Sequence, residues 1–521
     1  MLELVNMQEN HENYDENSKI MPKISKYTII LLGILALAFI IRFYYFPFEI
    51  PLNSDALYYF WYSTDISELG KLPSDWTPRN NGWSIFVSVF FSVFDGKDAQ
   101  ALMTLQRLLS VTLSIGITVP VYFLCKKFVK REFAIIGAAL IAFEPRLMIN
   151  SFLGITDPLY FLLIVSSLTV FLYANKKWVY FSFILVAFAT LVRGEGIVFF
   201  VVLSILFFIK FRNEKYKIIL KYILITSIFV LVILPLSVYK YDITENDGVF
   251  LRSINSAEQL FSTKEVSTDN ENKIFSGFEI FIKYFIWIMI PNFIIFLPLG
   301  ILLIFKKRTI ENLSIILSIG MMSIPAFYAY VLPALDTRYL YVLLPMFSVL
   351  AVITIQRIIG KNSKSNIFVI SIIVLIIISS VLFYDYKKID YEHERESFEI
   401  MGKISNITNG INVLNPETSY ISSVQTIKQW PTLYSEINFE LILIPTDNYN
   451  SMKEFILNSE DKGLTHVIVD GNFEREGFLK ESFIDETKYS YLKKVYDSKD
   501  DNFVYHVKVF EIDYKSLNNE K

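Results

Sequence analysis

Cysteine is almost absent from this chain, which has one, Cys125, among 521 residues. A single cysteine cannot form an intrachain disulfide, so any exported part must be stabilised by the packing of its own core. An excess of charge of one sign is also lacking, since 49 Lys and Arg face 52 Asp and Glu, for a net charge of -3. The basic residues stand in short clusters instead of one patch, and we expect no nucleic-acid partner.

Apolar residues are abundant: 53% of the chain is hydrophobic, 16% is aromatic, and the mean hydropathy is +0.41. This composition lies outside that of ordinary soluble proteins. It predicts a polytopic α-helical membrane protein with about eleven transmembrane helices, because that many apolar runs could cross a ~30 Å hydrocarbon layer. The runs begin near Tyr27, Leu102, Phe133, Pro158, Trp178, Ile197, Tyr222, Ile288, Leu313, Tyr339 and Asn366.

The basic clusters predict the orientation of these helices. With the N-terminus in the cytoplasm, all of them fall in inner loops, as expected for basic residues near short loops. The apolar stretch Trp83–Phe94 must then not cross the membrane, and we expect it to lie on the outer interface. The sequence thus predicts a multi-pass cell-membrane protein whose inner basic clusters are 126–131, 176–177, 210–221, 306–308 and 357–364.

Three parts are expected. Residues 1–26 are polar, without the features of a secretory signal, and are predicted to form a disordered cytoplasmic tail. Residues 27–384 form the transmembrane domain, with long external loops at 46–100 and 241–277. Residues 385–521 have the composition of a soluble domain and are predicted to form an extracytoplasmic α/β domain. Its expected strands are Ile411–Leu414, Leu441–Pro445, His466–Asp470 and Phe503–Ile512, and its expected helices are Ser419–Trp430, Ser451–Ser459 and Glu474–Phe483.

Acidic and guanidinium side chains gather at the predicted outer ends of the helices. Because such groups are costly near hydrocarbon, they are candidates for function. Helix ends far apart in sequence would bring them to one cleft, and the candidates are Asp55, Asp157, Arg193, Glu195, Asp336, Arg338 and Tyr339. Glycosyl transfer from a lipid-linked phosphate sugar needs this combination: a carboxylate to take the proton of the acceptor hydroxyl, and a fixed cation to stabilise the departing phosphate. Arginine suits the second role, since it can bind two phosphate oxygens at once.

At these residues the sequence resembles the GT-C superfamily of membrane glycosyltransferases, over about residues 27–384. The resemblance rests on the acid of the first external loop, the amphipathic stretch Pro78–Gly96, the acid before the fourth span, the Arg-Gly-Glu-Gly turn at 193–196 and the late Arg338-Tyr339 pair. The match is similar to protein O-mannosyltransferases and to the lipid A aminoarabinose transferase. It implies transfer of a sugar from a polyprenyl- or dolichyl-phosphate donor to a protein, lipid or glycan acceptor on the extracytoplasmic face.

The resemblance also implies roles for individual residues. Asp55 would be the catalytic base, and Asp157 a second acid that orients the acceptor or holds a cation. Arg338 would be the phosphate clamp, with Tyr339 beside it in the donor site, and Arg193 and Glu195 would support that site. Apart from the resemblance, the aromatic residues of the first loop that could contact the sugar are Tyr58, Tyr59 and Trp61.

The first external loop also resembles the catalytic subunit of oligosaccharyltransferase, in Tyr59-Phe60-Trp61-Tyr62 and Trp76-Thr77-Pro78, and Ser256-Ala257-Glu258 resembles its Ser-x-x-Glu element. No Trp-Trp-Asp-Tyr-Gly motif follows in the C-terminal domain. The likeness of the first loop favours transfer of a whole oligosaccharide and the missing motif speaks against it, so this function is kept as the alternative. A divalent cation, Mg²⁺ or Mn²⁺, also stays open, with Asp55, Asp157 and Glu258 as its ligands.

Simpler interpretations exist for each candidate. Asp55 could be a solvated or helix-capping residue, Asp157 an N-cap before Pro158, and Arg338 an interface anchor. Glu144 and Arg146 are expected to pair with each other. At the level of the whole protein, the alternatives are a transporter or flippase, for which polar sites near the bilayer midplane are expected, and a non-catalytic scaffold.

Overall fold

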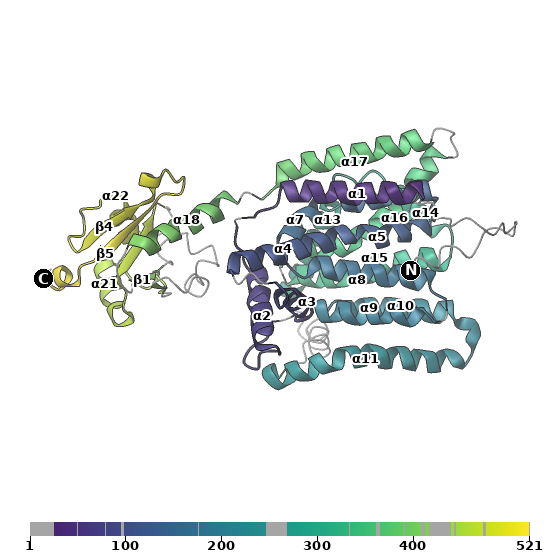
Figure 1. Cartoon of the computed structure of the whole chain (residues 1–521), viewed down its shortest axis with the longest axis horizontal. Helices are drawn as coiled ribbons and strands as arrows, with labels where there is room; N and C mark the ends of the chain where they lie inside the picture. Colours follow the sequence, from purple (N-terminus) through teal and green to yellow (C-terminus); the bar gives the residue numbers. More distant parts are fainter. Residues whose placement is uncertain are drawn as a thin grey trace, which may run out of the picture.

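The computed structural model of the chain describes residues 25–48, 50–78, 80–94, 98–175, 177–245, 268–332, 334–360, 365–389, 391–407, 412–415, 439–441, 444–471 and 476–519. These residues form a helical bundle and a smaller domain built on one sheet (Figure 1). The predicted tail, residue Glu258 and the predicted helix Ser419–Trp430 fall outside the described residues, apart from the last two residues of the tail.

The bundle contains helices that run side by side, with α2 and α3 lying across one of its ends (Figure 1). We call this end the site end. The helices are α1 (Lys26–Tyr44), α2 (Asp55–Leu69), α3 (Gly82–Phe91), α4 (Ala99–Gly116), α5 (Thr118–Lys126), α6 (Arg131–Ala142), α7 (Pro145–Phe152), α8 (Asp157–Tyr173), α9 (Val179–Val192), α10 (Gly196–Lys210), η2 (Arg212–Glu214), α11 (Lys217–Thr244), α13 (Thr268–Trp287), α14 (Leu297–Phe305), α15 (Ile310–Val331), η3 (Thr337–Leu343), α16 (Leu344–Ile359) and α17 (Ser365–Lys387).

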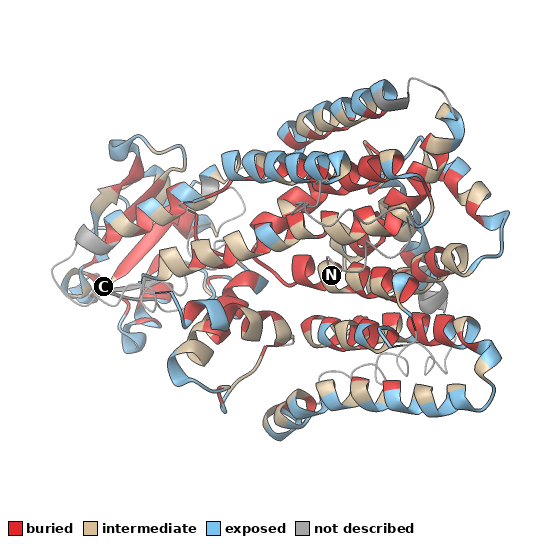
Figure 2. Cartoon of the chain, turned by 45° about the vertical axis from the view of Figure 1, so that its right-hand side comes forward, coloured by how far each residue is buried: buried red, intermediate tan, exposed pale blue. Residues whose placement is uncertain are grey.

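Apolar surface on the outside of the bundle confirms the membrane prediction. Six helical stretches of the described chain are long and apolar enough to cross a membrane, and four shorter apolar helices accompany them. In the most apolar stretches of α1, α11 and α17, only 22%, 17% and 22% of the residues are buried. In the stretch formed by η3 and α16, 72% are buried. The outer faces of α1, α11 and α17 are exposed (Figure 2). Exposed apolar surface on helices long enough to cross the hydrocarbon layer is expected of helices that face lipid.

The span predicted from Ile288 is interrupted in the structure. After α13 the chain makes a series of turns over residues 288–296 and becomes helical again only in α14. Backbone groups in such a break need partners inside the protein. Buried Arg146 supplies two of them, since its guanidinium donates to the carbonyl oxygens of Trp287, at 2.6 Å, and Ile290. Arg146 also pairs with Glu144 at 3.1 Å, as predicted.

Several basic loops meet at the end of the bundle opposite the site end. The backbone N–H of Lys130 donates to Gln356 Oε1 at 2.8 Å, and Lys127 lies over the ring of Tyr173. Lys210 donates to the carbonyl oxygen of Ala174 at 3.0 Å. The structure therefore gathers parts of clusters that are distant in sequence, in line with the alternation of helix directions that the sequence predicts.

The C-terminal domain has a mixed five-stranded sheet of order β2-β1-β3-β5-β4, in which β1 pairs in parallel with β2 and β3, and β5 pairs antiparallel with β3 and β4. The strand β4 was not predicted, because its Lys493 and Lys494 are exposed on an edge and break the apolar pattern. The elements are α18 (Glu392–Ile407), β1 (Asn412–Asn415), β2 (Phe439–Leu441), α21 (Met452–Leu457), η6 (Glu460–Lys462), β3 (His466–Asp470), α22 (Gly477–Ile484), β4 (Leu492–Asp497), η7 (Ser498–Asp501), β5 (Val507–Ile512) and α23 (Tyr514–Asn519).

Helix α18 connects the bundle to this domain (Figure 1). Its buried Glu396 accepts hydrogen bonds from the backbone N–H groups of Val504, at 2.9 Å, and Tyr505, at 2.8 Å. Because α17 ends at the site end, the sheet domain lies beyond the same end of the bundle as α2 and α3 (Figure 1).

Candidate functional site

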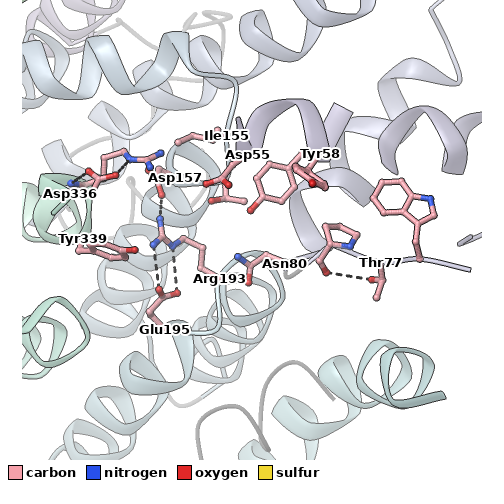
Figure 3. Close-up of a pocket in the computed structure, with 15 residues that line it drawn as sticks. Asp55, Tyr58, Thr77, Asn80, Ile155, Asp157, Arg193, Glu195, Asp336 and Tyr339 are labelled. Atoms are coloured by element: carbon pink, nitrogen blue, oxygen red, sulfur yellow. Dashed lines mark hydrogen bonds and ion pairs between the residues drawn. The ribbon is translucent and has the colours of Figure 1, made fainter. Parts of the chain in front are cut away.

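A cavity of about 510 Å³ opens at the site end of the bundle (Figure 3). All eight residues to which the sequence gives a catalytic or donor-site role line it, although they come from four separate regions of the chain. Its walls are formed by Asp55, Tyr58, Tyr59, Trp76, Thr77, Pro78, Asn80, Ile155, Thr156, Asp157, Arg193, Glu195, Asp336, Arg338 and Tyr339.

Asp55 is exposed to this cavity at the first position of α2. The N-cap residue is Ser54, and the Asp55 carboxylate makes no hydrogen bond or ion pair with another described residue. Its carboxylate is therefore not used to cap the helix. It stays available to a molecule that enters the cavity.

Asp157 is fully buried at the start of α8, with both carboxylate oxygens engaged. Arg193 Nη1 bonds Oδ1, and Asn150 Nδ2 donates to Oδ2 at 3.0 Å. Arg193 lies in the turn between α9 and α10, and its Nη2 also bonds Glu195 at 3.3 Å. Figure 3 shows the guanidinium between the two acids. Burial lowers the pKa of Arg193, but Glu195 and Asp157 outweigh this and raise the pKa well above its usual value.

Arg338 is the second cation of the cavity and is only partly engaged. Its Nε bonds Asp336 at 2.5 Å, and the same carboxylate accepts from its backbone N–H at 2.8 Å. Its two Nη groups make no hydrogen bond to any described residue, and the side chain is 33% exposed. The guanidinium of Arg338 is thus held at Nε by Asp336, while its two Nη groups are available to a ligand.

Aromatic rings complete the walls. The Tyr58 side chain is exposed, whereas Tyr59 is buried. The centre of the Tyr339 ring lies 6.0 Å from the Arg193 guanidinium, and that of the buried Tyr160 ring lies 5.7 Å from it. Tyr341, two residues after Tyr339, is buried, and its hydroxyl is hydrogen-bonded to that of Thr337 at 2.9 Å. The rings therefore confine Arg193.

No family model matches this chain, and no curated protein matches it. Solved structures do match. The apo oligosaccharyltransferase of Archaeoglobus fulgidus aligns over 86% of this chain and 70% of its own, with 12% sequence identity and a TM-score of 0.55. ArnT from Cupriavidus metallidurans aligns over 95% of this chain and 99% of its own, with 10% identity and a TM-score of 0.57. Both have the GT-C fold. The chain has the GT-C fold.

Within this GT-C fold, a smaller cavity of about 230 Å³ adjoins the first. The two share Asp55, Ile155 and Arg338. The remaining wall includes Tyr391 and Glu394, from the segment that leads into the C-terminal domain. Asp55 and Arg338 therefore line both cavities, and the segment that leads into the C-terminal domain forms part of the wall of the smaller one.

A metal site does not form among the described residues. Within that part of the chain, no three His, Cys, Asp or Glu side chains lie close enough to hold an ion. Of the three predicted ligands, Asp157 is already bonded to Arg193 and Asn150, and Glu258 lies outside the described residues. The described side chains therefore do not form a cation site by themselves.

Sequence reasoning missed some of the polar partners. Asp336 was recognised near Arg338 but given no role. Asn150 was not noticed, although an amide within the apolar run Leu147–Phe152 is itself a sign of a buried polar contact. Asn80 and Trp76 belong to the first loop, whose likeness to oligosaccharyltransferase pointed to this wall.

The buried ion pair makes a prediction about stability. Arg193→Met should lower the free energy of unfolding by about 3–5 kcal/mol, because it leaves the fully buried Asp157 carboxylate without its cation. Thermal unfolding in detergent measures this. The control Lys403→Met breaks the exposed pair with Asp501 and should cost less than about 1 kcal/mol. Equal, small losses in the two variants would show that the buried pair does not stabilise the bundle.

Proposed function

We propose that the protein is a membrane glycosyltransferase that transfers a sugar from a polyprenyl-phosphate donor to a hydroxyl group on the extracytoplasmic face. One observation carries the proposal: a single cavity is lined by the unpaired carboxylate of Asp55 and by Arg338, whose Nη groups are not bonded to a described residue. These are the two groups that the reaction needs, and the GT-C fold of the chain supports it.

Asp55 acts as the general base. In the transfer, the acceptor oxygen forms a bond to the anomeric carbon while its proton passes to the Asp55 carboxylate, and the bond from the anomeric carbon to the phosphate oxygen breaks with inversion. Of the four acids that line the cavity, Asp157, Glu195 and Asp336 are bonded to an arginine. Asp55 alone among these four is left to accept a proton.

Arg338 stabilises the departing lipid phosphate. Its free Nη groups can bind two phosphate oxygens, and its Nε bond to Asp336 holds the guanidinium plane in place. Arg193 is engaged by two acids and serves to hold the walls of the cavity together. Asp157, expected to orient the acceptor or hold a cation, acts in our proposal through Arg193.

The donor and the side of the membrane follow from two further observations. A structure of ArnT bound to undecaprenyl phosphate matches this chain with a TM-score of 0.53 over 94% of its length and 99% of that of ArnT, at 11% identity. This favours a polyprenyl-phosphate carrier. The basic loops opposite the site end favour a cytoplasmic position for that end, which puts the cavity outside.

The acceptor enters through the smaller cavity, since both Asp55 and the segment that leads into the C-terminal domain line it. A protein, lipid or glycan hydroxyl fits this scheme, and the C-terminal domain would dock the molecule that bears it. The oligosaccharyltransferase of A. fulgidus has also been crystallised with Zn and sulfate. Because the described residues do not form a metal site, no step of our mechanism passes through one.

Two alternatives are less well supported. Transfer of a whole lipid-linked oligosaccharide would need an acceptor-reading motif, and the Trp-Trp-Asp-Tyr-Gly sequence is absent. A transporter or flippase would need its polar site near the middle of the bundle, with access from both sides. The polar cavity instead lies at the site end, where α2 supplies Asp55, Tyr58 and Tyr59 to its wall (Figure 1).

Removing the base should stop the reaction. Asp55→Asn keeps the size of the side chain but cannot accept the proton, so sugar transfer should fall by about 10²–10⁴-fold. A radiolabelled polyprenyl-phosphate sugar offered to the purified protein, with label in the acceptor as readout, measures the change. Glu68→Gln, an exposed acid on the same helix, should transfer at the wild-type rate. Turnover of Asp55→Asn at the wild-type rate would remove Asp55 from the mechanism.

Removing the clamp should impair use of the donor. Arg338→Ala should lower kcat/KM for the donor by about 10- to 100-fold, because hydrogen bonds to a charged group contribute about 1.5–3 kcal/mol each. Arg212→Ala, an exposed arginine at the opposite end of the bundle, is the control. If both variants use the donor equally well, Arg338 does not bind its phosphate.

A further inference from the structure

We infer that Gln106 and Arg107, neighbours on α4, are positioning residues that fix Asp55 and the Asp157 loop relative to each other. Neither residue was named as a candidate from the sequence, although Arg107 lies within the apolar run that begins near Leu102. The inference rests on the proposed function for its catalytic consequence, but the contacts that carry it are properties of the structure alone.

Arg107 binds carbonyl oxygens of both loops. The side chain is buried, with 3% of its surface exposed, and its Nε donates to Phe152 at 2.9 Å, five residues before Asp157. Its Nη2 donates to Pro51 at 2.8 Å, and its Nη1 bonds the carbonyl oxygens of Pro47, at 3.2 Å, and Ile50. Four main-chain acceptors therefore share one guanidinium, and they belong to the segments that lead into α2 and α8.

Gln106 continues this bridge on the next residue of α4. It is fully buried, and its Nε2 donates to the carbonyl oxygen of Ala56 at 3.0 Å and to that of Gly154 at 2.7 Å. Ala56 directly follows Asp55, and Gly154 stands three residues before Asp157. Because both neighbours are acceptors, the amide nitrogen must face them. The side-chain amide of Gln106 thus links the first turn of α2, which carries Asp55, to the loop that leads into Asp157.

Strain in the backbone shows why such a bridge is needed. Ser54, directly before Asp55, has a φ of 52°, a region that residues other than glycine rarely adopt. Such a conformation persists only where the surrounding contacts impose it. Arg107 bonds the chain on one side of Ser54, at Pro51, and Gln106 bonds it on the other, at Ala56. The two side chains therefore bracket the strained residue that sets the direction of Asp55.

Catalysis depends on such placement, since a misplacement of about 1 Å can cost on the order of 10²-fold in rate. Gln106 does not line the cavity, so it acts through the two loops and not on a substrate. Arg107 borders the smaller cavity, but four of its N–H groups are directed to carbonyl oxygens.

The test is Gln106→Met in the full-length protein, in lipid nanodiscs. Methionine keeps the volume of the side chain and removes both hydrogen bonds. With a radiolabelled polyprenyl-phosphate sugar, kcat should fall by about 30- to 100-fold while KM for the donor changes by less than about threefold, since the donor contacts are untouched. Gln100→Met is the matched control, because Gln100 also lies on α4 and donates, at 3.1 Å, to a carbonyl of the same loop, that of Phe48.

Hydrogen exchange gives a readout that does not depend on activity. Backbone amides of residues 55–60 and 152–157 should exchange faster in Gln106→Met than in Gln100→Met, because the loops lose the bridge. Equal exchange in the two variants, or equal kcat, would overturn the inference. If the wild-type protein transfers no sugar from the polyprenyl donor, the proposed function fails, and the exchange comparison still decides whether Gln106 holds the two loops.

Discussion

A carboxylate that is fully buried beside apolar helices is stable only when a cation and further donors neutralise it. Asp157 meets this condition through Arg193 and Asn150, and the rest of the site depends on it. The pair ties the start of α8 to the turn between α9 and α10, and Glu195 on that turn adds a second bond to the same arginine. Of the charged groups that line the cavity, the Asp55 carboxylate and the Nη groups of Arg338 make no hydrogen bond to a described residue, and in our proposal these are the groups that act on the substrates.

The same constraint governs the uncharged parts of the site end. Main-chain carbonyl oxygens of the loops here accept hydrogen bonds from buried side chains, as backbone groups away from water require. Arg107 and Gln106 do so for the Asp55 and Asp157 loops, and Arg146 does so for the break before α14. The rigidity required for catalysis and the satisfaction of buried backbone groups are thus provided by the same contacts, which is why irregular segments could be kept near the membrane surface.

The sequence identified candidate site residues where a charged side chain stands beside an apolar run, because such a group is energetically costly near lipid. Charged groups beside apolar runs are few, and Asp55, Asp157 and Arg338 could be selected from the amino-acid sequence for that reason. Their partners could not. Which acid bonds Arg193 depends on how α8 and α9 pack, and the carbonyl acceptors of Arg107 leave no trace in a sequence because every residue has one. For a similar reason, strand β4 was missed, since its exposed lysines reflect its place at the sheet edge.

The central claim is that a lipid phosphate and an acceptor meet between Asp55 and Arg338. A cryo-EM structure of the full-length protein with a polyprenyl phosphate tests it most directly. Our account predicts that the phosphate lies within hydrogen-bond distance of the Nη groups of Arg338, in the cavity that Asp55 lines, with the prenyl chain running along the apolar outer face of the bundle. A phosphate bound among the basic loops at the opposite end, with the cavity unchanged, would contradict the account.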